Sequence, residues 1–172
     1  MSSSDDRRVV ETQIGRPLRA DSEVVARCHL DQPVVVRVPP KLDDGTPFPT
    51  LYWLTCPLAI SRIGRLEGSG GVKRMEAKAD ADPGFAARLN EAHDRYETER
   101  AALDDEGQGP QATGGVGGAR AGVKCLHAHY AHQVGGGENP VGELVAGWIE
   151  PLDCEQPCVV DGSINPDWVN RP

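Results

Sequence analysis

One short segment of the sequence concentrates side chains that bind metals or carry out acid–base chemistry. It contains Cys125, His127, His129 and His132. At about 100° per residue on a helix, Cys125, His129 and His132 share one face. A thiolate and two imidazoles are ligands that zinc and similar metals accept. We therefore expect a metal site here, with Cys56 and Cys28 as the natural candidates for a fourth ligand.

His127 lies on the opposite face of the same predicted helix, which carries an apolar stripe. That position favours a buried histidine with one hydrogen bond over a metal ligand. The whole segment also allows a plainer interpretation, a polar helix face with a buried free cysteine. A second pair of thiols, Cys154 and Cys158, is a weaker candidate for metal ligands, because the surrounding sequence predicts little regular structure.

Cys56 closes a predicted buried strand and precedes Pro57, which suits the first turn of a helix. A thiol at a helix N-terminus is biased toward thiolate and could act as a nucleophile. The spacing from Cys56 to Arg62 matches that of Cys-dependent phosphatases, but the residues between lack glycine, and Pro57 has no N–H to offer a phosphate. We also expect the sulfurs of Cys56 and Cys125 to lie within about 5 Å of each other in one site.

Three functions are compatible with these residues. The first is binding of a metal or a protein partner without catalysis, with zinc or an iron–sulfur cluster as the cofactor. The second is an enzyme with Cys56 or Cys125 as nucleophile and His127 or His132 as base. The third is a metal-dependent hydrolase with an open coordination position. The sequence has no obvious oxyanion loop or paired carboxylate near the cluster, so the binding function is favoured.

The strands and helices that must position these residues can be predicted from sequence patterns. They indicate an α+β fold, with a small, mostly antiparallel sheet packed against several helices in a single domain. Runs of β-branched or aromatic residues predict strands at 24–28, 34–38 and 50–55. Apolar spacing between proline and glycine boundaries predicts helices at 57–67, 72–79, 83–103, 123–134 and 140–149. The Cys/His segment therefore falls on a helix, and Cys56 falls at a junction between strand and helix.

The remaining segments are predicted to be connections or tails. Residues 1–8 are polar and typical of a disordered tail ahead of a globular domain at 9–150. Within that domain, the Gly-rich stretch 106–122 predicts a flexible loop that could be shortened with little loss of stability. Residues 151–172 are rich in Pro, Asp and Asn and predict an extended C-terminal tail.

Composition narrows the range of partners. The chain has 172 residues and a formal net charge of −8, which disfavours nucleic acid and anionic membrane surfaces. No apolar run approaches the ~20 residues of a membrane helix, and residues 1–8 hold no apolar signal region, so we expect a cytoplasmic protein. In that reducing compartment the five cysteines are expected to be free or metal-bound rather than disulfide-bonded.

Three stretches, residues 47–57, 123–129 and 139–142, resemble in order and spacing the domain of unknown function 501 family, which is widespread in actinobacteria. The resemblance covers about residues 9–148. It implies no established activity, although family genes often lie beside genes for a septum-formation initiator and an exopolyphosphatase. It also implies that Cys56, Cys125, His127 and His132 occupy family positions, whereas His129 varies. If the helix begins after Cys125, the argument from the helical wheel fails and His127 could turn inward.

Overall fold

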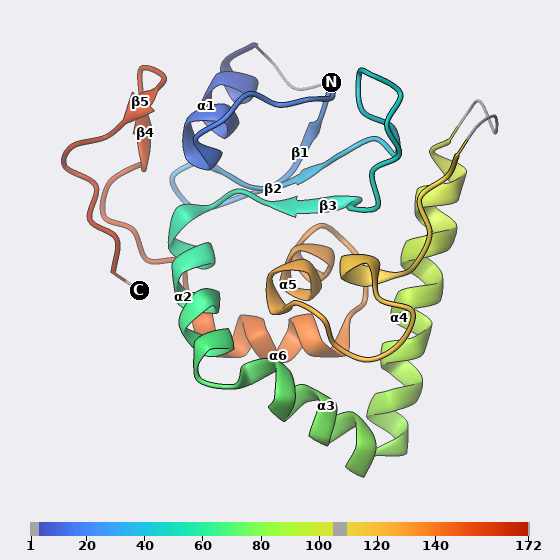
Figure 1. The fold of residues 1–172 in the computed structure, drawn as a ribbon. Coiled ribbons are helices and arrows are strands. Elements are labelled where there is room, and N and C mark those ends of the chain that lie inside the picture. Colours follow the sequence, from blue (N-terminus) through green and yellow to red (C-terminus); the bar gives the residue numbers. More distant parts are fainter. Residues whose placement is uncertain (1–3, 105–109, 172) are drawn as a thin grey trace.

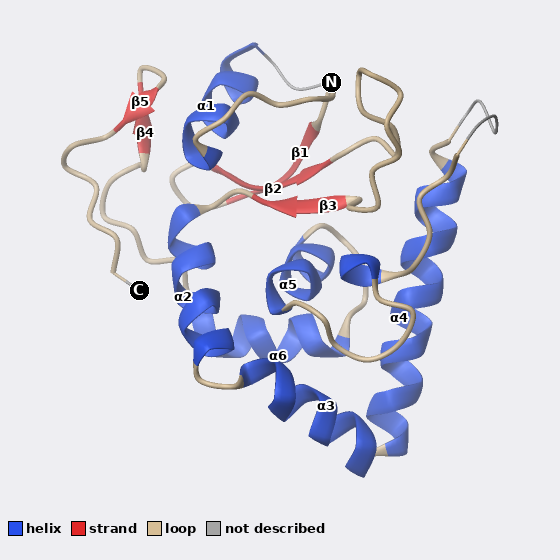
Figure 2. Ribbon diagram, viewed as in Figure 1, coloured by secondary structure: helices blue, strands red, loops and turns tan. Residues whose placement is uncertain are grey.

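A three-stranded antiparallel sheet, in the order β1-β2-β3, divides the helices into two groups (Figure 1). The computed structural model describes residues 4–104 and 110–171. The strands are β1 (Glu23–Arg27), β2 (Pro33–Arg37) and β3 (Tyr52–Leu54). Helix α1 (Ser4–Ile14) covers one face of the sheet, and the other helices gather on the opposite face (Figure 2). The predicted α+β fold in a single domain is confirmed.

The central strand β2 is buried on both of its faces. Alternation sends Val35 toward the helices below the sheet and Val36 toward α1 above it, and both side chains are fully buried. A continuous apolar run is therefore what this strand requires, since a helix covers each face. The larger core lies below the sheet, where the candidate site is also found.

Five helices lie below the sheet in the described residues, and the three that start at Pro57, Pro83 and Pro140 begin where the sequence predicts. The five are α2 (Pro57–Gly68), α3 (Gly71–Ala81), α4 (Pro83–Ala102), α5 (Leu126–Val134) and α6 (Pro140–Ile149). Asp82 caps α4 by accepting the N–H of Phe85 at 3.0 Å, and Asn139 caps α6. Within the described parts of the chain, no helix combines the length and apolar character that crossing a bilayer needs.

Helix α5 begins later than the sequence predicts. The prediction placed its start at Val123, whereas Cys125 is the N-cap residue with extended backbone (φ −155°, ψ 120°) and the helix begins at Leu126. The N–H of Leu126 donates to Glu67 Oε1 of α2 at 2.6 Å. A side chain of a different helix therefore accepts a backbone N–H of the first turn of α5. The sequence around Cys125 gives no sign of this contact.

The Gly-rich segment is packed, which corrects its prediction as a flexible loop. It contains the short 3₁₀ turn η1 (Val116–Gly118), and the Val116 side chain is fully buried in the main core. Gly115 lies so close to His93 that an added Cβ would stand 2.5 Å from the ring Nδ1. Glycine here permits close approach to α4 rather than mobility. Residues 105–109 of the predicted loop lie outside the described residues.

Both ends of the chain are also more structured than the sequence predicts. Residues 1–8 were expected to be disordered, but Ser4–Ile14 form α1. The helix is stabilised because Val10 is buried against the sheet face that carries Val36. Residues 1–3 lie outside the description. The C-terminal segment, predicted as an extended tail, contains a hairpin of β4 (Val159–Val160) and β5 (Ser163–Ile164) that packs beside α1.

Candidate functional site

Three potential ligand atoms converge where α5 begins beside the last turn of α2. The Nδ1 atom of His127 lies 3.2 Å from Glu67 Oε1 and 3.9 Å from Cys125 Sγ. All three ligand atoms lie within 4.8 Å of one another, and in the described residues this is the one group of at least three such side chains that meets this limit. The late start of α5 is what allows the arrangement, because Cys125 is extended and its side chain leaves the helix register.

The second ring nitrogen of His127 has a different partner. Nε2 lies 3.2 Å from the carbonyl oxygen of Ile60, which can only accept a hydrogen bond. Nε2 must therefore carry a proton, and in the neutral ring the lone pair is left on Nδ1, where it faces Cys125 and Glu67. Metal-binding histidines in proteins are commonly oriented by this kind of carbonyl contact.

The electrostatic surroundings of His127 favour positive charge. Burial lowers the pKa of the imidazole, but the hydrogen bond with Cys125 and the charge of Glu67 outweigh burial and raise it to about 9. About a quarter of the His127 side chain (26%) remains exposed, so solvent ions can reach it. The N-terminus of α5 adds a partial positive charge beside the thiol and the carboxylate. The cluster is thus a site where protons and cations compete for the same three atoms.

An apolar pocket opens beside this cluster. Its volume is about 510 Å³, and Cys125 and His127 form part of its wall. The other lining residues are mostly aromatic or aliphatic: Phe48, Thr50, Tyr52, Trp53, Leu54, Ile60, Gly117 and Ala128. Phe48 and Trp53 stack with ring centroids 5.5 Å apart. A small molecule with an apolar body and a polar end would therefore fit next to the thiol and imidazole.

His129 and His132 lie in the core and contact Asn139, not the Cys125 cluster. The oxygen of the Asn139 amide accepts the N–H groups of Val141 and Gly142 at 3.1 and 3.0 Å. Its nitrogen lies 3.0 Å from His129 Nδ1 and 3.2 Å from His132 Nδ1. One amide thus caps α6 and donates to both imidazoles. The face that the sequence predicted for metal binding is the face that packs inward.

Burial keeps these two histidines uncharged. It lowers the pKa of His129 to about 3 and that of His132 to about 4. The His132 ring stacks on Tyr52 and meets Tyr96 edge-on, at centroid distances of 5.7 and 5.1 Å. The Nε2 atom of His129 is buried without a hydrogen-bond partner, while its ring contacts His93 edge-on. These features are those of a structural network.

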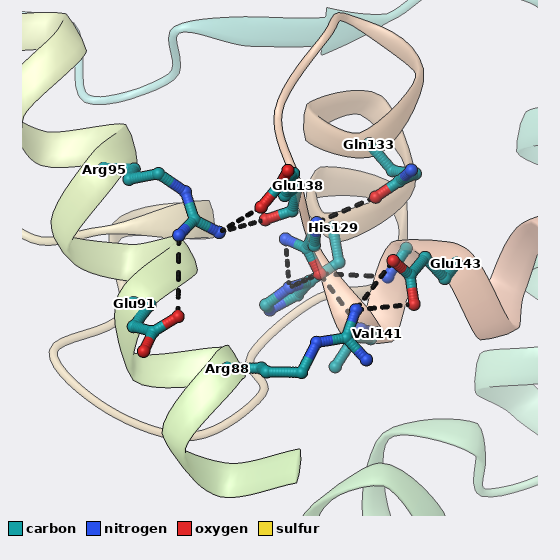
Figure 3. A network of polar contacts seen from close by, with 10 residues as sticks. Arg88, Glu91, Arg95, His129, Gln133, Glu138, Val141 and Glu143 are labelled. Atoms are coloured by element: carbon teal, nitrogen blue, oxygen red, sulfur yellow. Dashed lines mark hydrogen bonds and ion pairs between the residues drawn. The ribbon is translucent and has the colours of Figure 1, made fainter. Parts of the chain in front are cut away.

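The outer side of this network is closed by ion pairs between α4 and the start of α6. Figure 3 shows Arg95 reaching Glu138 and Glu91, and Arg88 holding both carboxylate oxygens of Glu143 at 2.7 and 2.8 Å. These pairs are exposed, so each contributes little to stability. The pairs of Arg88 and Arg95 with Glu143 and Glu138 connect α4 to the beginning of α6.

The other cysteines form a separate group. Cys28 and Cys56 line a second, smaller pocket together with Cys154 and Cys158, and this pocket shares no lining residue with the one at Cys125. Cys56 and Cys125 therefore line different pockets, although the sequence had placed them in one site. Burial also raises the pKa of Cys56 to about 11 and outweighs the nearby backbone N–H groups of α2, so the expectation of a thiolate at this helix N-terminus is corrected.

Sequence reasoning missed three residues that build these sites. Glu67 sits at the end of a predicted helix with nothing local to indicate that it meets Cys125. Asn139 precedes Pro140 and carries a recognisable cap signal, but no spacing rule links it to two histidines. His93 accepts the N–H of Val116 at 3.0 Å and so connects α4 to the Gly-rich segment.

Comparison with known proteins gives one match. A family model described as a protein of unknown function (DUF501) matches residues 24–147. No curated protein and no solved structure matches the chain. The matched range includes Glu67, Cys125 and His127, whereas Cys154 and Cys158 lie beyond its end.

Proposed function

The chain belongs to the DUF501 family, and from that premise we propose that it binds a divalent metal ion of the zinc type through Glu67, Cys125 and His127. The observation that carries the proposal is the convergence of one oxygen, one sulfur and one nitrogen on a single point. Carboxylate, thiolate and imidazole are the three side-chain groups that zinc uses in proteins. The function favoured by the sequence was binding of a metal or a protein partner without catalysis, and its helical wheel pointed to a different set of histidines.

The distances between the ligand atoms suit one ion. For tetrahedral zinc with its usual bond lengths, the nitrogen and oxygen ligands stand about 3.3 Å apart, and the nitrogen and sulfur ligands about 3.5 Å apart. The corresponding distances here are 3.2 Å and 3.9 Å. A contraction of a few tenths of an ångström at the sulfur would complete the geometry. The carbonyl of Ile60 already holds the imidazole in the tautomer that a metal requires.

The same geometry disfavours a thiol enzyme. In a Cys–His–carboxylate triad the thiol and the carboxylate contact opposite nitrogens of the imidazole, so that the carboxylate orients the base. Here both Cys125 and Glu67 face Nδ1, and the backbone oxygen of Ile60 occupies Nε2. The two groups compete for one nitrogen, which is the arrangement of ligands around a cation.

Three protein ligands leave one position of a tetrahedral ion for another molecule. Catalytic zinc sites have this composition, whereas structural sites are closed by a fourth side chain. Cys125 and His127 line the apolar pocket, so the fourth ligand would come from there. A bound ion would polarise a carbonyl or activate a water at that position. The favoured substrate class is thus a small apolar molecule with an oxygen ligand.

The test is a titration with Co²⁺, which replaces zinc and shows a charge-transfer absorption when a thiolate binds it. We expect one ion per chain. Cys125→Ser should abolish the charge-transfer band. His127→Ala should weaken binding by at least ~100-fold, because even the loss of a supporting residue around a metal costs about tenfold to a hundredfold.

The matched control is His29→Ala, which removes an exposed imidazole remote from the site. It should leave cobalt affinity and the absorption band unchanged. Glu67→Gln refines the test, since glutamine can still accept the Leu126 N–H but is a poorer ligand. Binding of cobalt that survives in both Cys125→Ser and His127→Ala would refute the proposal.

A further inference from the structure

Four of the five cysteines surround the second pocket, and they come from three separate parts of the chain. Cys28 follows β1, Cys56 caps α2, and Cys154 and Cys158 belong to the C-terminal segment. Apart from two glutamines, Gln32 and Gln156, the rest of the lining is leucine, proline and tryptophan. Thiols are thus the main reactive groups of this apolar pocket. The pocket lies where the C-terminal segment meets the family domain, which is the part of the chain that the family model matches, residues 24–147.

Cys158 is connected to Cys28 through contacts with Gln32. The Sγ atom of Cys158 lies 3.8 Å from Oε1 of Gln32 and accepts the Nε2–H of Gln13 at 3.4 Å. The backbone oxygen of Gln32 accepts the N–H of Cys28 at 3.0 Å. One residue therefore bridges the two cysteines. Burial raises the pKa of Cys158, and the charges of Cys28 and Cys154 act in the same direction.

The remaining thiols are arranged differently. Cys154 Sγ accepts the indole N–H of Trp168 at 3.4 Å, within the C-terminal segment itself. Cys56 and Cys158 are buried, whereas Cys28 and Cys154 are partly exposed. In the described chain, no three of these four sulfurs lie within 4.8 Å of one another. The pocket is therefore not a preformed tetrathiolate metal site, and pairwise chemistry is favoured.

We propose that Cys28 and Cys158 form a reversible disulfide that fastens the C-terminal segment to the family domain. The oxidant is a low-molecular-weight disulfide, RSSR. The partly exposed Cys28 thiolate attacks one sulfur of RSSR, and RS⁻ leaves. Cys158, as thiolate, then attacks the Cys28 sulfur of the mixed disulfide and expels the second RS⁻. The two cysteines lose two electrons and two protons, which convert RSSR into two RSH.

The attachment of the segment shows what the bond would change. Arg62 of α2 donates to the backbone oxygens of Ile149 and Pro151, both at 2.7 Å. On the other side, Arg8 donates to the backbone oxygen of Asp161 at 2.8 Å. These hydrogen bonds are partly or fully exposed and reversible. A covalent bond at Cys158, between the two anchors, would convert a docked segment into a closed loop and restrict the unfolded chain.

The test uses the full chain, reduced and then incubated with oxidised glutathione. Free thiols should fall from five to three, because one disulfide consumes two. Peptide mapping by mass spectrometry should identify a bond between Cys28 and Cys158. The melting temperature of the oxidised protein should exceed that of the reduced protein by about 10 °C, as expected when a disulfide closes a loop of more than a hundred residues.

Variants separate this site from the proposed metal site. Cys28→Ser and Cys158→Ser should each prevent the bond, and Cys28→Ser guards against misfolding because its side chain is partly exposed. Cys154→Ser and Cys125→Ser should leave it intact. A bond that joins only Cys154 and Cys158 would overturn the proposal, and so would five free thiols after oxidation. Zinc binding lost in both Cys28→Ser and Cys158→Ser would also overturn it, in favour of a metal site.

Discussion

The histidines of α5 occupy two opposite environments only a few residues apart. His127, in the first turn, faces a thiol and a carboxylate near solvent, and its pKa rises to about 9. His132, in the last turn, lies between aromatic rings in the core, and its pKa falls to about 4. At the start of α5 a histidine therefore lies where it can bind a proton or a cation. At the end of the same helix a histidine is packed as a neutral ring. The surroundings, and not the residue type, separate a candidate site from a structural network.

The comparison also shows what each environment demands of its neighbours. Around His127, the partners are acidic or nucleophilic groups with access to solvent, which stabilise charge. Around His129 and His132, the partner is an amide that donates hydrogen bonds to neutral rings. Removing a neighbour should thus alter binding in the first case and stability in the second. Three changes test this difference, beginning with the largest expected effect.

The first is Asn139→Ala, which we expect to lower the free energy of unfolding by about 3–6 kcal/mol. The change removes the cap of α6 and leaves the acceptors of two buried imidazoles without a donor. Chemical denaturation measures the loss. Asn139→Asp keeps the capping oxygen but replaces the amide donors with a buried carboxylate, so its loss reports the imidazole contacts together with the cost of burying a charge. An alanine variant as stable as the wild type would show that this network contributes no stability.

The second is acidification from pH 7 to pH 5, which should lower the free energy of unfolding by about 2 kcal/mol for each of His129 and His132. Their ordinary pKa of 6.5 applies in the unfolded chain, whereas the folded values are about 3 and about 4. Below pH 6.5 these two imidazoles therefore become protonated in the unfolded state, whereas in the folded state they stay neutral. Stability is full above pH 6.5 and falls as the pH decreases toward 4.

His127 has the opposite sign, which supplies an internal control. Its folded pKa of about 9 exceeds 6.5, so its contribution is complete below pH 6.5 and is lost as the pH rises through 9. Urea denaturation between pH 5 and pH 9 measures both effects and should be repeated on His132→Gln. From pH 7 to pH 5 this variant should lose about half as much free energy of unfolding as the wild type. Equal acid losses in the two proteins would contradict the assignment of a neutral, buried His132.

The third is a matched pair of alanine substitutions. His132→Ala should lower the free energy of unfolding by about 3 kcal/mol, because it leaves a cavity between Tyr52 and Tyr96. At pH 9, where most of the charge-dependent contribution of this side chain has been lost, His127→Ala should change it by about 1 kcal/mol or less. Cobalt affinity should respond in the reverse order, unchanged in the first variant and lowered in the second. If both variants lose stability and metal together, the two environments are one coupled site.

Much of the fold could be predicted because local signals and packing agree. The β-branched run at Val34–Val36 is buried on both faces, and Pro57, Pro83 and Pro140 each begin a helix as their fixed backbone angle favours. The prediction failed where tertiary contacts supply the stabilisation. Helix α1 is polar except for a few positions such as Val10. It is stabilised by packing against the sheet, and the sequence of the first residues gives no sign of this contact.

The candidate site was less predictable for a related reason. A wheel drawn through Cys125 assumes that the helix includes it, and that assumption selected His129 and His132. The resemblance to the family instead selected His127, which the structure places beside Cys125. The residue that moves the helix start, Glu67, comes from α2 and appears in no local pattern. A site assembled from two helices can be recognised only when their packing is known.

The side chain of Asn139 has a consequence for how the protein opens. Its oxygen holds the first amides of α6, while its nitrogen holds imidazoles on α5. The two helices cannot separate without breaking the contacts between the amide nitrogen and the two imidazoles. The two helices and the turn between them should therefore unfold as a single cooperative unit in native-state hydrogen exchange. The backbone amides of Val141 and Gly142 would then exchange with the same opening free energy as those in the middle of α5.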